Sequence, residues 1–450
     1  MKLQRSYYVP LLLFLLCFGF HFTGYSQGGF QLPNGKSKDK IPFELVNNLV
    51  VIPVEVNGKK LSFLLDTGVN HTLLFSLEAR DSMFINNVVP VTLKGLGEGG
   101  DIEALKSSNN QLKIGKAIDK NHMVYVIFNQ KINFSPRMGI PIHGVIGYDL
   151  FKDFVVKTDY DSEIITLYSP KDYKPRRCRS CESFDLILAQ NKPFLRNRIT
   201  SNNVQHNVTL LVDSGASDAL WLFDEKFGIE DTPKNYFRDF LGLGLSGGVN
   251  GKRSKMDEVA LGSFSFKNVN VAYPDSIAIG NLRASSSRHG TLGSDILRRF
   301  TVIMDYRAKK LTLKKNNYYA RPFHYNMSGI IMEHSGMVPV KSVKTRKSEA
   351  VRLDKKNGAT SAVNIDVNPL ITFFLTPKFV IAEVREGSPA DLAGVEVGDE
   401  VLSINGKPFY QWKLPEVSEL FSSKSGRKIV LQIVRNGMKV KKRFTLKAML

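Results

Sequence analysis

Two acidic residues head short motifs of one type. Asp66 begins an Asp-Thr-Gly motif and Asp213 begins an Asp-Ser-Gly motif, each directly after a short apolar run. Two carboxylates that are held about 3 Å apart cannot both ionise, so such a pair shares one proton. One acid can then polarise a carbonyl group while the other takes a proton from water. The motifs predict hydrolysis by an activated water, without a covalent enzyme intermediate.

Small and hydroxyl-bearing residues follow each acid. Gly68 and Gly215 lack side chains, which allows tight backbone packing around the two carboxylates. Thr67 and Ser214 place a hydroxyl beside each acid, where it can form hydrogen bonds across the junction of two halves. We therefore expect these four residues to support the catalytic loops.

The two motifs are part of a longer internal repeat. The acids Asp66 and Asp213 are 147 residues apart, and other blocks recur at the same offset or at 146. A constant offset in several ordered blocks predicts a duplicated lobe, in residues 40–170 and 182–316. Acids that only stabilise turns are the structural alternative, but such turns have no reason to recur in this order.

Turn residues and short apolar runs predict β-strands to position the acids. Asn57-Gly58 fits a two-residue type I′ turn in a hairpin that spans residues 51–66. The apolar run before each acid suits a strand that is buried on both faces. Asp149 and Asp295 open short helical stretches, and we expect them to act as N-caps. Neither half contains long helical periodicity.

The paired motifs, each followed later by a block of two hydrophobic or polar residues and a glycine, resemble the aspartic proteases of the pepsin–retropepsin superfamily. The resemblance implies a mainly β, bilobal, acid-protease-like fold in which each lobe donates one catalytic aspartate. It also implies that residues 145–147 and 291–293 pass close behind the catalytic loops. The glycine-rich segment 95–100 lies where the base of a substrate-covering flap would be, but no flap tyrosine is evident.

The C-terminal third has a different character. Within residues 388–406 stands the string Ser-Pro-Ala-x-x-Ala-Gly, followed by Gly-Asp and Ile-Asn-Gly. This string resembles the PDZ domains of bacterial proteases, which implies a partly open β-barrel with two helices over residues 325–448. Such domains capture peptides by strand addition, here beside a helix expected at residues 414–424. The alternative is a PDZ fold that only braces the protease.

The peptide-binding loop of this domain is placed at Ser328, Gly329, Ile330 and Ile331, which open the module. A basic insertion near residues 336–377 would separate this loop from the rest of the domain.

The N-terminus predicts export. Lys2 and Arg5 precede an apolar run at residues 7–20, and small residues precede a cleavage point after Ser26. This pattern is typical of a secretory signal peptide, residues 1–26, and places the protein in the periplasm, in the cell envelope or outside the cell. In an oxidising compartment Cys178 and Cys181 can form a small disulfide loop; a redox Cys-x-x-Cys site is the alternative.

The composition and net charge limit which binding partners and cofactors the protein is expected to have. The 450 residues are 43% hydrophobic, which excludes a disordered chain, and they carry a net charge of +20. Such a charge points to an anionic neighbour, but export and the lack of a nucleic-acid-binding motif argue against nucleic acid. A solvated surface is the simplest interpretation, with attraction to an anionic envelope surface as a further hypothesis. The eight histidines show no metal-binding spacing, so neither a metal nor another cofactor is expected.

These observations predict an exported aspartic endopeptidase that hydrolyses peptide bonds with Asp66 and Asp213, while the PDZ domain recruits protein or peptide substrates. Because one chain supplies both acids, we expect a monomer. The alternative is a non-catalytic peptide-binding or scaffold protein that retains a protease-like fold.

Overall fold

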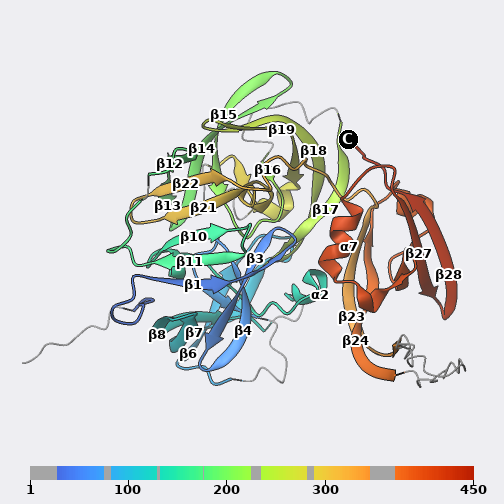
Figure 1. The fold of residues 1–450 in the computed structure, drawn as a ribbon, viewed down its shortest axis with the longest axis horizontal. Coiled ribbons are helices and arrows are strands. Elements are labelled where there is room, and N and C mark those ends of the chain that lie inside the picture. Colours follow the sequence, from blue (N-terminus) through green and yellow to red (C-terminus); the bar gives the residue numbers. More distant parts are fainter. Residues whose placement is uncertain are drawn as a thin grey trace, which may run out of the picture.

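The computed structural model describes residues 28–75, 83–128, 132–175, 177–223, 235–280, 288–344 and 370–450. The predicted signal peptide, residues 1–26, lies outside them. Figure 1 shows two β-rich lobes with a smaller C-terminal domain beside them, and the expected mainly β class is confirmed. None of the helices in the described ranges is long and apolar enough to cross a membrane.

Lobe 1 is built on an eight-stranded sheet in the order β2-β3-β4-β9-β5-β8-β7-β6. Its strand β4 pairs in parallel with β9, so residues 145 and 146 of the predicted block lie in a strand beside the one that ends just before Asp66. Its elements are β2 (Glu44–Val46), β3 (Leu49–Val56), β4 (Lys59–Leu65), β5 (Thr72–Leu74), β6 (Val88–Lys94), β7 (Asp101–Ile114), β8 (Ala117–Val126), α2 (Ser135–Met138), β9 (Gly144–Ile146) and α3 (Tyr148–Phe151).

Lobe 2 repeats this sheet in the order β13-β14-β15-β20-β16-β19-β18-β17, which confirms the duplication. The parallel pair is now β15 and β20, beside Asp213. Its elements are β13 (Ile187–Ala189), β14 (Lys192–Ser201), β15 (Val204–Val212), β16 (Leu220–Leu222), β17 (Phe237–Gly244), β18 (Gly247–Leu261), β19 (Phe264–Pro274), η3 (Ser276–Ile279), β20 (Gly290–Leu292) and α5 (Ser294–Leu297).

The hairpin before the first acid forms as predicted. Strands β3 and β4 pair in antiparallel register around Asn57 and Gly58, whose φ angles are 48° and 86°. A type I′ turn requires positive φ at both positions, which explains the Asn-Gly pair. The hairpin thereby sets the register that brings Asp66 to the end of β4.

A third sheet joins the two lobes. Its order is β1-β11-β10-β21-β22-β12, and β10 of lobe 1 pairs directly with β21 of lobe 2, with Val156 opposite Met304. One buried apolar cluster contains residues of both lobes, so the lobes share a core, and each lobe also has a smaller cluster of its own. The strands are β1 (Lys38–Pro42), β10 (Val155–Asp159), β11 (Ile164–Tyr168), β12 (Cys181–Asp185), β21 (Phe300–Asp305) and β22 (Lys310–Lys315).

The expected N-caps are wrong. The short helices α3 and α5 begin after Gly147 and Gly293, which make no side-chain cap. Asp149 instead accepts hydrogen bonds from the backbone N–H and hydroxyl of Thr72, at 3.0 and 3.1 Å. Asp295 pairs with Arg298. Tertiary partners have drawn these carboxylates away from the helix N-termini.

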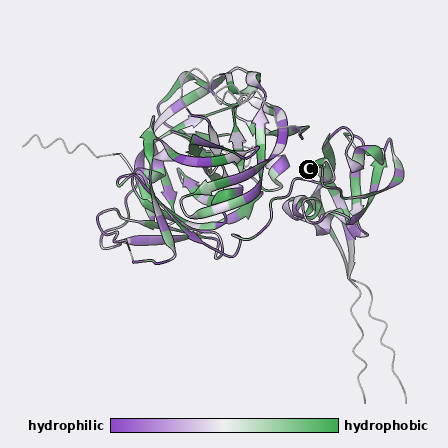
Figure 2. Cartoon of the chain, turned by 90° about the horizontal axis from the view of Figure 1, so that it is seen from above, coloured by the Kyte–Doolittle hydropathy of each residue, from purple (hydrophilic) through white to green (hydrophobic). Residues whose placement is uncertain are grey.

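The C-terminal domain is a β-sheet with two short helices, the predicted PDZ architecture, and it stands as a separate body beside the lobes (Figure 2). The predicted helix at 414–424 ends earlier, at Phe421. The elements are β23 (Ile330–Lys344), β24 (Leu370–Val384), α6 (Pro389–Leu392), β25 (Glu400–Ile404), β26 (Lys407–Pro408), η4 (Phe409–Gln411), α7 (Leu414–Phe421), β27 (Lys428–Arg435) and β28 (Met438–Thr445).

The basic segment near residues 336–377 does not leave the fold at its ends. Residues 337–344 and 370–377 continue β23 and β24 as an antiparallel ladder, after a register shift beside Ser335. The two ends of the insertion therefore lengthen the β23–β24 hairpin. Its middle, residues 345–369, lies outside the described ranges.

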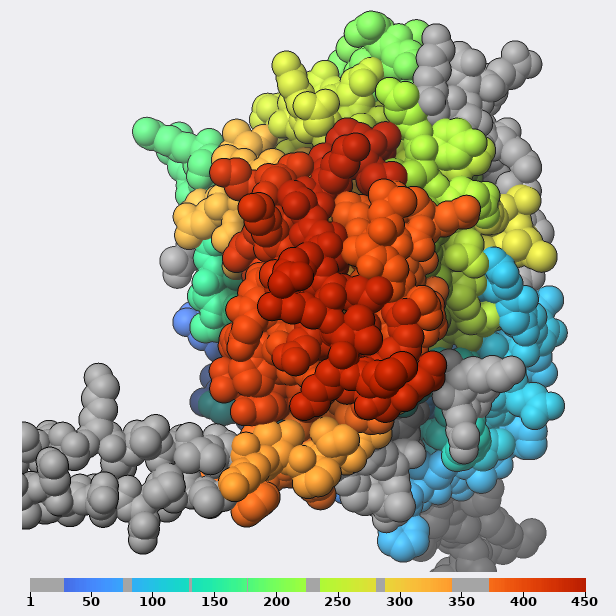
Figure 3. Space-filling model, turned by 90° about the vertical axis from the view of Figure 1, so that its right-hand side faces the viewer, coloured from blue at the N-terminus to red at the C-terminus, as the bar shows by residue number. Residues whose placement is uncertain are grey.

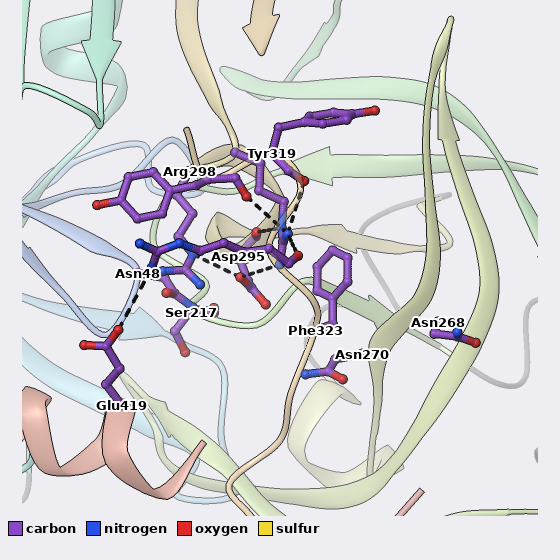
Figure 4. Close-up of polar contacts among 12 residues, drawn as sticks. Asn48, Ser217, Asn268, Asn270, Asp295, Arg298, Tyr319, Phe323 and Glu419 are labelled. Carbon is purple, nitrogen blue, oxygen red and sulfur yellow. Dashed lines mark hydrogen bonds and ion pairs between the residues drawn. The ribbon is translucent and has the colours of Figure 1, made fainter. Parts of the chain in front are cut away.

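A buried arginine holds the connection between lobe 2 and the C-terminal domain. Arg299 is fully buried, donates to the carbonyl oxygen of Asp295 at 2.7 Å and also binds the carbonyl oxygen of Arg321. Its guanidinium lies 3.6 Å from the ring centroid of Phe323. Figure 4 shows Asp295, Arg298, Tyr319 and Phe323 gathered at this point. The connector is thus tied to the same helix that follows the catalytic block of lobe 2.

Candidate active site

The two motif acids occupy equivalent places in the lobes. Asp66 follows β4, and its backbone N–H donates to the carbonyl oxygen of Ile146 at 2.9 Å. Asp213 follows β15 and donates in the same way to Leu292, also at 2.9 Å. The blocks at 145–147 and 291–293 therefore lie directly against the motif loops, as the resemblance implies.

The hydroxyl groups of the motifs cross the junction between the lobes. The backbone N–H of Thr67 donates to Oγ of Ser214, and the N–H of Ser214 donates to Oγ1 of Thr67, both at 3.0 Å. Oγ1 of Thr67 donates to the carbonyl oxygen of Val212 at 2.6 Å, and Oγ of Ser214 donates to that of Leu65 at 2.8 Å. Because all four bonds are buried or nearly so, they fix one motif loop against the other.

The glycines of the motifs bring the two carboxylates together. Within each loop the glycine N–H donates to the preceding acid: Gly68 to Asp66 at 2.6 Å and Gly215 to Asp213 at 2.9 Å. A methyl group added to Gly68 would lie 2.9 Å from the carboxyl carbon of Asp213, and one on Gly215 would lie closer still to the carboxylate of Asp66. Each acid is thus packed against the glycine of the opposite motif.

This proximity changes the titration of the pair. Burial raises the pKa of Asp66 well above its ordinary value, and the neighbouring charge of Asp213 raises it further. The charges of the pair also act on Tyr306, whose buried hydroxyl has no hydrogen-bond partner within the described structure. Burial raises the pKa of Tyr306, and the charges of Asp66 and Asp213 add to the effect. The site therefore favours a dyad that retains a proton.

The repeated glycine segments form two hairpin tips that meet. The N–H of Gly99 donates to the carbonyl oxygen of Ser246 at 2.5 Å, and the N–H of Ser246 donates to that of Leu96 at 2.8 Å. A methyl group on Gly97 would lie 2.7 Å from the backbone of Gly247. The tips belong to the β6–β7 hairpin of lobe 1 and the β17–β18 hairpin of lobe 2, so glycine is needed where backbones approach this closely.

Each tip also reaches into the opposite lobe. Leu96 of lobe 1 packs on a lobe 2 cluster that includes Leu241 and Val249, with Trp221 at its edge. Leu245 of lobe 2 packs on the lobe 1 cluster against which Val69, the neighbour of Gly68, also packs. The segment where a flap base was expected is therefore one of two hairpin tips that contact each other across the lobes.

The predicted peptide-binding loop of the C-terminal domain is internally bonded. The N–H groups of Ser328 and Gly329 both donate to Oδ1 of Asn326, at 3.0 and 3.2 Å. The N–H of Ile330 donates to Oγ of Ser328 at 3.0 Å, and Ile330 and Ile331 are the first residues of β23 to pair with β24. A bound carboxylate would have to displace Asn326 from these amides.

A helix of lobe 1 packs where strand addition would place a peptide. The helix α2 packs against both β23 and α7. Its Arg137 forms ion pairs with Glu383 of β24 at 2.8 Å and with Glu333 of β23 at 3.4 Å. The guanidinium of Arg137 also lies 4.5 Å from the ring centroid of Phe240 in lobe 2.

Lobe 2 holds the C-terminal domain through a chain of charges. Arg385 lies 3.6 Å from Asp239, which pairs with Arg253 at 2.8 Å, and Arg253 pairs with Asp218 at 2.9 Å. These residues line a cavity of about 200 Å³ that also reaches Gly329. Figure 3 shows the C-terminal domain covering this side of the lobes. Asp218 lies five residues after Asp213, so the contact with the C-terminal domain lies close in sequence to the motif loop of lobe 2.

Other site predictions have simple outcomes. Cys178 and Cys181 form a disulfide with a Cα–Cα distance of 5.3 Å. In the part of the chain that is described, no group of three His, Cys, Asp or Glu side chains is placed to hold a metal ion.

Three residues near the dyad were missed by the sequence analysis. Tyr306, Lys192 and Arg288 all interact electrostatically with one or both motif acids. The repeat offset was the available signal for Tyr306, since it matches Tyr160. The two basic residues stand in no motif, so only the strand pairings reveal them.

Comparison with known proteins follows the same division of the chain. Residues 52–150 and 198–296 match the sequence model of a family described as "Aspartyl protease", and residues 380–435 match that of a family described as "PDZ domain". Each aspartyl protease match contains one motif acid. These matches confirm the two resemblances inferred from the sequence.

Two individual proteins are also similar. A "probable periplasmic serine endoprotease DegP-like" from Ectopseudomonas mendocina (strain ymp) is 38% identical over 68 residues, which are 15% of this chain and only 14% of that protein. The crystal structure of an aspartic proteinase from Irpex lacteus aligns at 12% identity and a TM-score of 0.39, over 63% of this chain and 99% of that one.

Proposed function

We propose that this chain is an exported aspartic endopeptidase in which Asp66 and Asp213 activate a water molecule for attack on a peptide bond. The observation that carries the proposal is the packing of each motif glycine against the carboxylate of the opposite motif. This packing places one acid from each lobe in a single site, which a duplicated binding scaffold would have no reason to preserve. The aspartyl protease matches on both lobes support the same conclusion.

The proposed reaction uses one shared proton. The ionised member of the dyad takes a proton from water, and the protonated member donates to the carbonyl oxygen of the peptide. The resulting tetrahedral intermediate collapses when one carboxyl group gives a proton to the amide nitrogen and the C–N bond breaks, while the other carboxylate takes a proton from a hydroxyl of the intermediate. This transfer restores the single shared proton of the dyad. The raised pKa of Asp66 keeps the shared proton available, and the apparent pKa values belong to the pair.

The paired hairpin tips would control access to the dyad. Backbone hydrogen bonds join Gly99 and Ser246, and Leu96 packs on the opposite lobe. A peptide entering beneath the tips would first have to separate these contacts. Closure of the tips over the peptide would then exclude water from the reaction, as in other enzymes with mobile flaps.

The C-terminal domain is proposed to recruit substrate or a partner protein. Its β23 and α7 would receive a peptide by strand addition, yet α2 of lobe 1 packs against both. Recruitment would therefore require α2 to move aside. Until that happens, the domain braces the lobes through Arg137 and Arg385.

Export, monomeric state and attraction to an anionic envelope surface complete the proposal. The basic N-terminal segment and its apolar run support export. The relative from Ectopseudomonas mendocina is described as periplasmic, which agrees with that compartment. Both acids come from one chain, so the rate of hydrolysis per protein molecule should not change when the protein is diluted. Binding to anionic vesicles should weaken as salt is added.

The deciding experiment uses the chain without residues 1–26. Its cleavage of a mixed peptide library is followed by mass spectrometry from acidic to neutral pH, beside Asp66→Asn and Asp213→Asn. We expect each substitution to reduce the rate by at least about 10³-fold, since both acids act in one step. Cleavage that survives either substitution contradicts the dyad. Peptide binding without any cleavage would instead favour the scaffold alternative.

A further inference from the structure

The strand register identifies the residue that faces each acid. In lobe 1, Val51 pairs with Leu64, so continuing the antiparallel register places Leu49 opposite Asp66. In lobe 2, Phe194 pairs with Leu211, and the same continuation places Lys192 opposite Asp213. The duplicated hairpins therefore present a buried leucine at one acid and a lysine at the other.

A second pair of equivalent positions shows the same change. His143 accepts from the N–H of Ser62 through Nδ1, and His289 accepts from that of Thr209 in the same way, at 3.1 and 3.0 Å. The residue before His143 is Ile142, which is fully buried in the apolar cluster of lobe 1. The residue before His289 is Arg288. Two apolar positions of lobe 1 are thus basic in lobe 2.

Among the described residues, neither basic side chain forms an ion pair, and the negative charges that act on them are those of the motif acids. Arg288 is only 8% exposed, and its Nε has no hydrogen-bond partner within the described structure. Its guanidinium lies 5.3 Å from the ring centroid of Phe223, a cation–π contact that supplies no negative charge. Lys192 is half-buried, and no ion pair to it is found among the described residues. A buried charge without a partner is costly, so these positions favour an anion that arrives from outside.

The dyad itself does not supply enough negative charge. The acids Asp66 and Asp213 raise the pKa of Lys192, but burial and the charge of Arg288 lower it more. Burial also lowers the pKa of Arg288, against the influence of Asp213. A dyad that shares one proton carries one negative charge. Two cations beside it leave an excess of one positive charge.

We propose that Lys192 and Arg288 form a subsite for a carboxylate of the peptide substrate, beside the dyad on the lobe 2 side. The inference rests on the proposed function and specifies the substrate class: peptides with an acidic side chain, or with their C-terminal carboxylate, near the cleaved bond. Both carboxylates have the same chemistry, and a guanidinium beside an ammonium can bind either through charge-assisted hydrogen bonds. Leu49 and Ile142 make the corresponding positions of lobe 1 unsuitable for such a group.

The test uses two matched pairs of peptides. The members of the first pair differ only in having Glu or Gln next to the cleaved bond. The members of the second pair both have Gln there, and the chain ends at that residue in a free carboxylate or in an amide. The wild-type chain should favour the carboxylate member of a pair by about 10- to 100-fold in kcat/KM, the range expected for hydrogen bonds to a charged group. Lys192→Leu and Arg288→Ile, which install the lobe 1 residues, should bring the ratio toward one. The pair that shows the preference identifies the source of the carboxylate.

Matched controls separate recognition from general effects. Lys310→Met removes one exposed lysine of the shared sheet, 46% exposed at its side chain, and should leave the ratio unchanged. If Lys192 and Arg288 only adjust the titration of the dyad, Lys192→Leu will alter the rates for both peptides equally. That result, or a wild-type ratio near one, overturns the subsite. Thermal melting checks that each variant folds, and Arg288→Gln replaces Arg288→Ile if the latter does not.

A binding measurement makes the inference independent of catalysis. The same peptide pairs, made with a reduced bond that cannot be hydrolysed, are titrated against the wild-type chain by fluorescence anisotropy. Tighter binding of the carboxylate peptide, lost in Lys192→Leu, supports the subsite even if no substrate is cleaved. Equal binding overturns it even if the chain proves to be a protease.

Discussion

The two lobes repeat one backbone plan but differ in the side chains that flank their acids. Both have a strand that ends at an aspartate, a hydroxyl that crosses the junction and a glycine that touches the opposite carboxylate. Around the acids, lobe 1 presents Leu49 and Ile142 where lobe 2 presents Lys192 and Arg288. The hydroxyl and the glycine through which one motif contacts the other are therefore present in both lobes. The other positions near the acids differ in charge between the lobes.

The largest expected effect concerns the motif glycines, which both lobes share. Gly215→Ala places a methyl group against the carboxylate of Asp66, and Gly68→Ala does so less severely against Asp213. Since the flexible carboxylate rather than the backbone must move, we expect a loss of activity with little loss of stability. A displacement of about 1 Å can cost about 10²-fold, so kcat/KM should fall by that much or more for Gly215→Ala and by less for Gly68→Ala.

Gly280→Ala is the matched control for this prediction, because no atom lies within 4 Å of the added methyl group. Peptide hydrolysis measured on the three variants decides the outcome. Full activity in both motif variants would contradict the packing of each acid against the opposite glycine.

The next prediction concerns the hydroxyl groups that cross the junction. Thr67→Val removes the acceptor of the Ser214 N–H and the donor to the carbonyl oxygen of Val212. Ser214→Ala removes the acceptor of the Thr67 N–H and the donor to the carbonyl oxygen of Leu65. Each change leaves buried polar groups unpaired, which should cost about 1–3 kcal/mol of unfolding free energy. Urea unfolding of the single and double variants should show coupling, since both residues share one network.

Thr312→Val provides the comparison for an exposed pair, because Thr312 and Ser183 join hydroxyls at 2.7 Å on the surface. That substitution should cost less than about 1 kcal/mol. Strictly additive effects of Thr67→Val and Ser214→Ala would show that the two lobes are not fixed to each other through these groups.

A smaller effect is expected in the pH dependence of kcat/KM. It concerns Lys192, at a position where the two lobes differ. The charge of Lys192 lowers the pKa of Asp66, against burial and Asp213, which raise it. Lys192→Leu removes that cation, so the pKa of Asp66 rises and the dyad keeps its proton to higher pH. The alkaline limb of kcat/KM for a neutral peptide should therefore move to higher pH. Movement to lower pH would contradict the placement of Lys192; Lys310→Met should leave the limb in place.

The smallest effect concerns how each lobe holds the C-terminal domain. Lobe 1 uses Arg137, which is partly exposed and pairs with the partly exposed Glu383. Lobe 2 uses Asp239, which faces Arg385 of the C-terminal domain, and the Arg385 side chain is only 5% exposed. Exposed pairs contribute about 0.2–1 kcal/mol, so Arg137→Gln should reduce the unfolding free energy by no more than that in urea denaturation. A larger loss would mean that α2 is a principal attachment of the domain.

The predictable part of the site is local. Asp66 and Asp213 stand at the ends of apolar runs, and the Asn57-Gly58 turn forms because those two residue types tolerate positive φ. Asp149 and Asp295 show where local reasoning fails. Their position near a helix start suggested caps, but Thr72 and Arg298 compete for the same carboxylates from outside the local segment.

The sequence by itself determined the duplicated lobes, the paired acids and the PDZ-like third, because each of these is written in residue order and spacing. Only the tertiary structure decided that β10 and β21 join the lobes in one sheet and that the hairpin tips meet at Gly99 and Ser246. The physical reason is the separation of the partners along the chain. Contacts between residues about 150 positions apart depend on how whole sheets pack, and no local propensity encodes that packing.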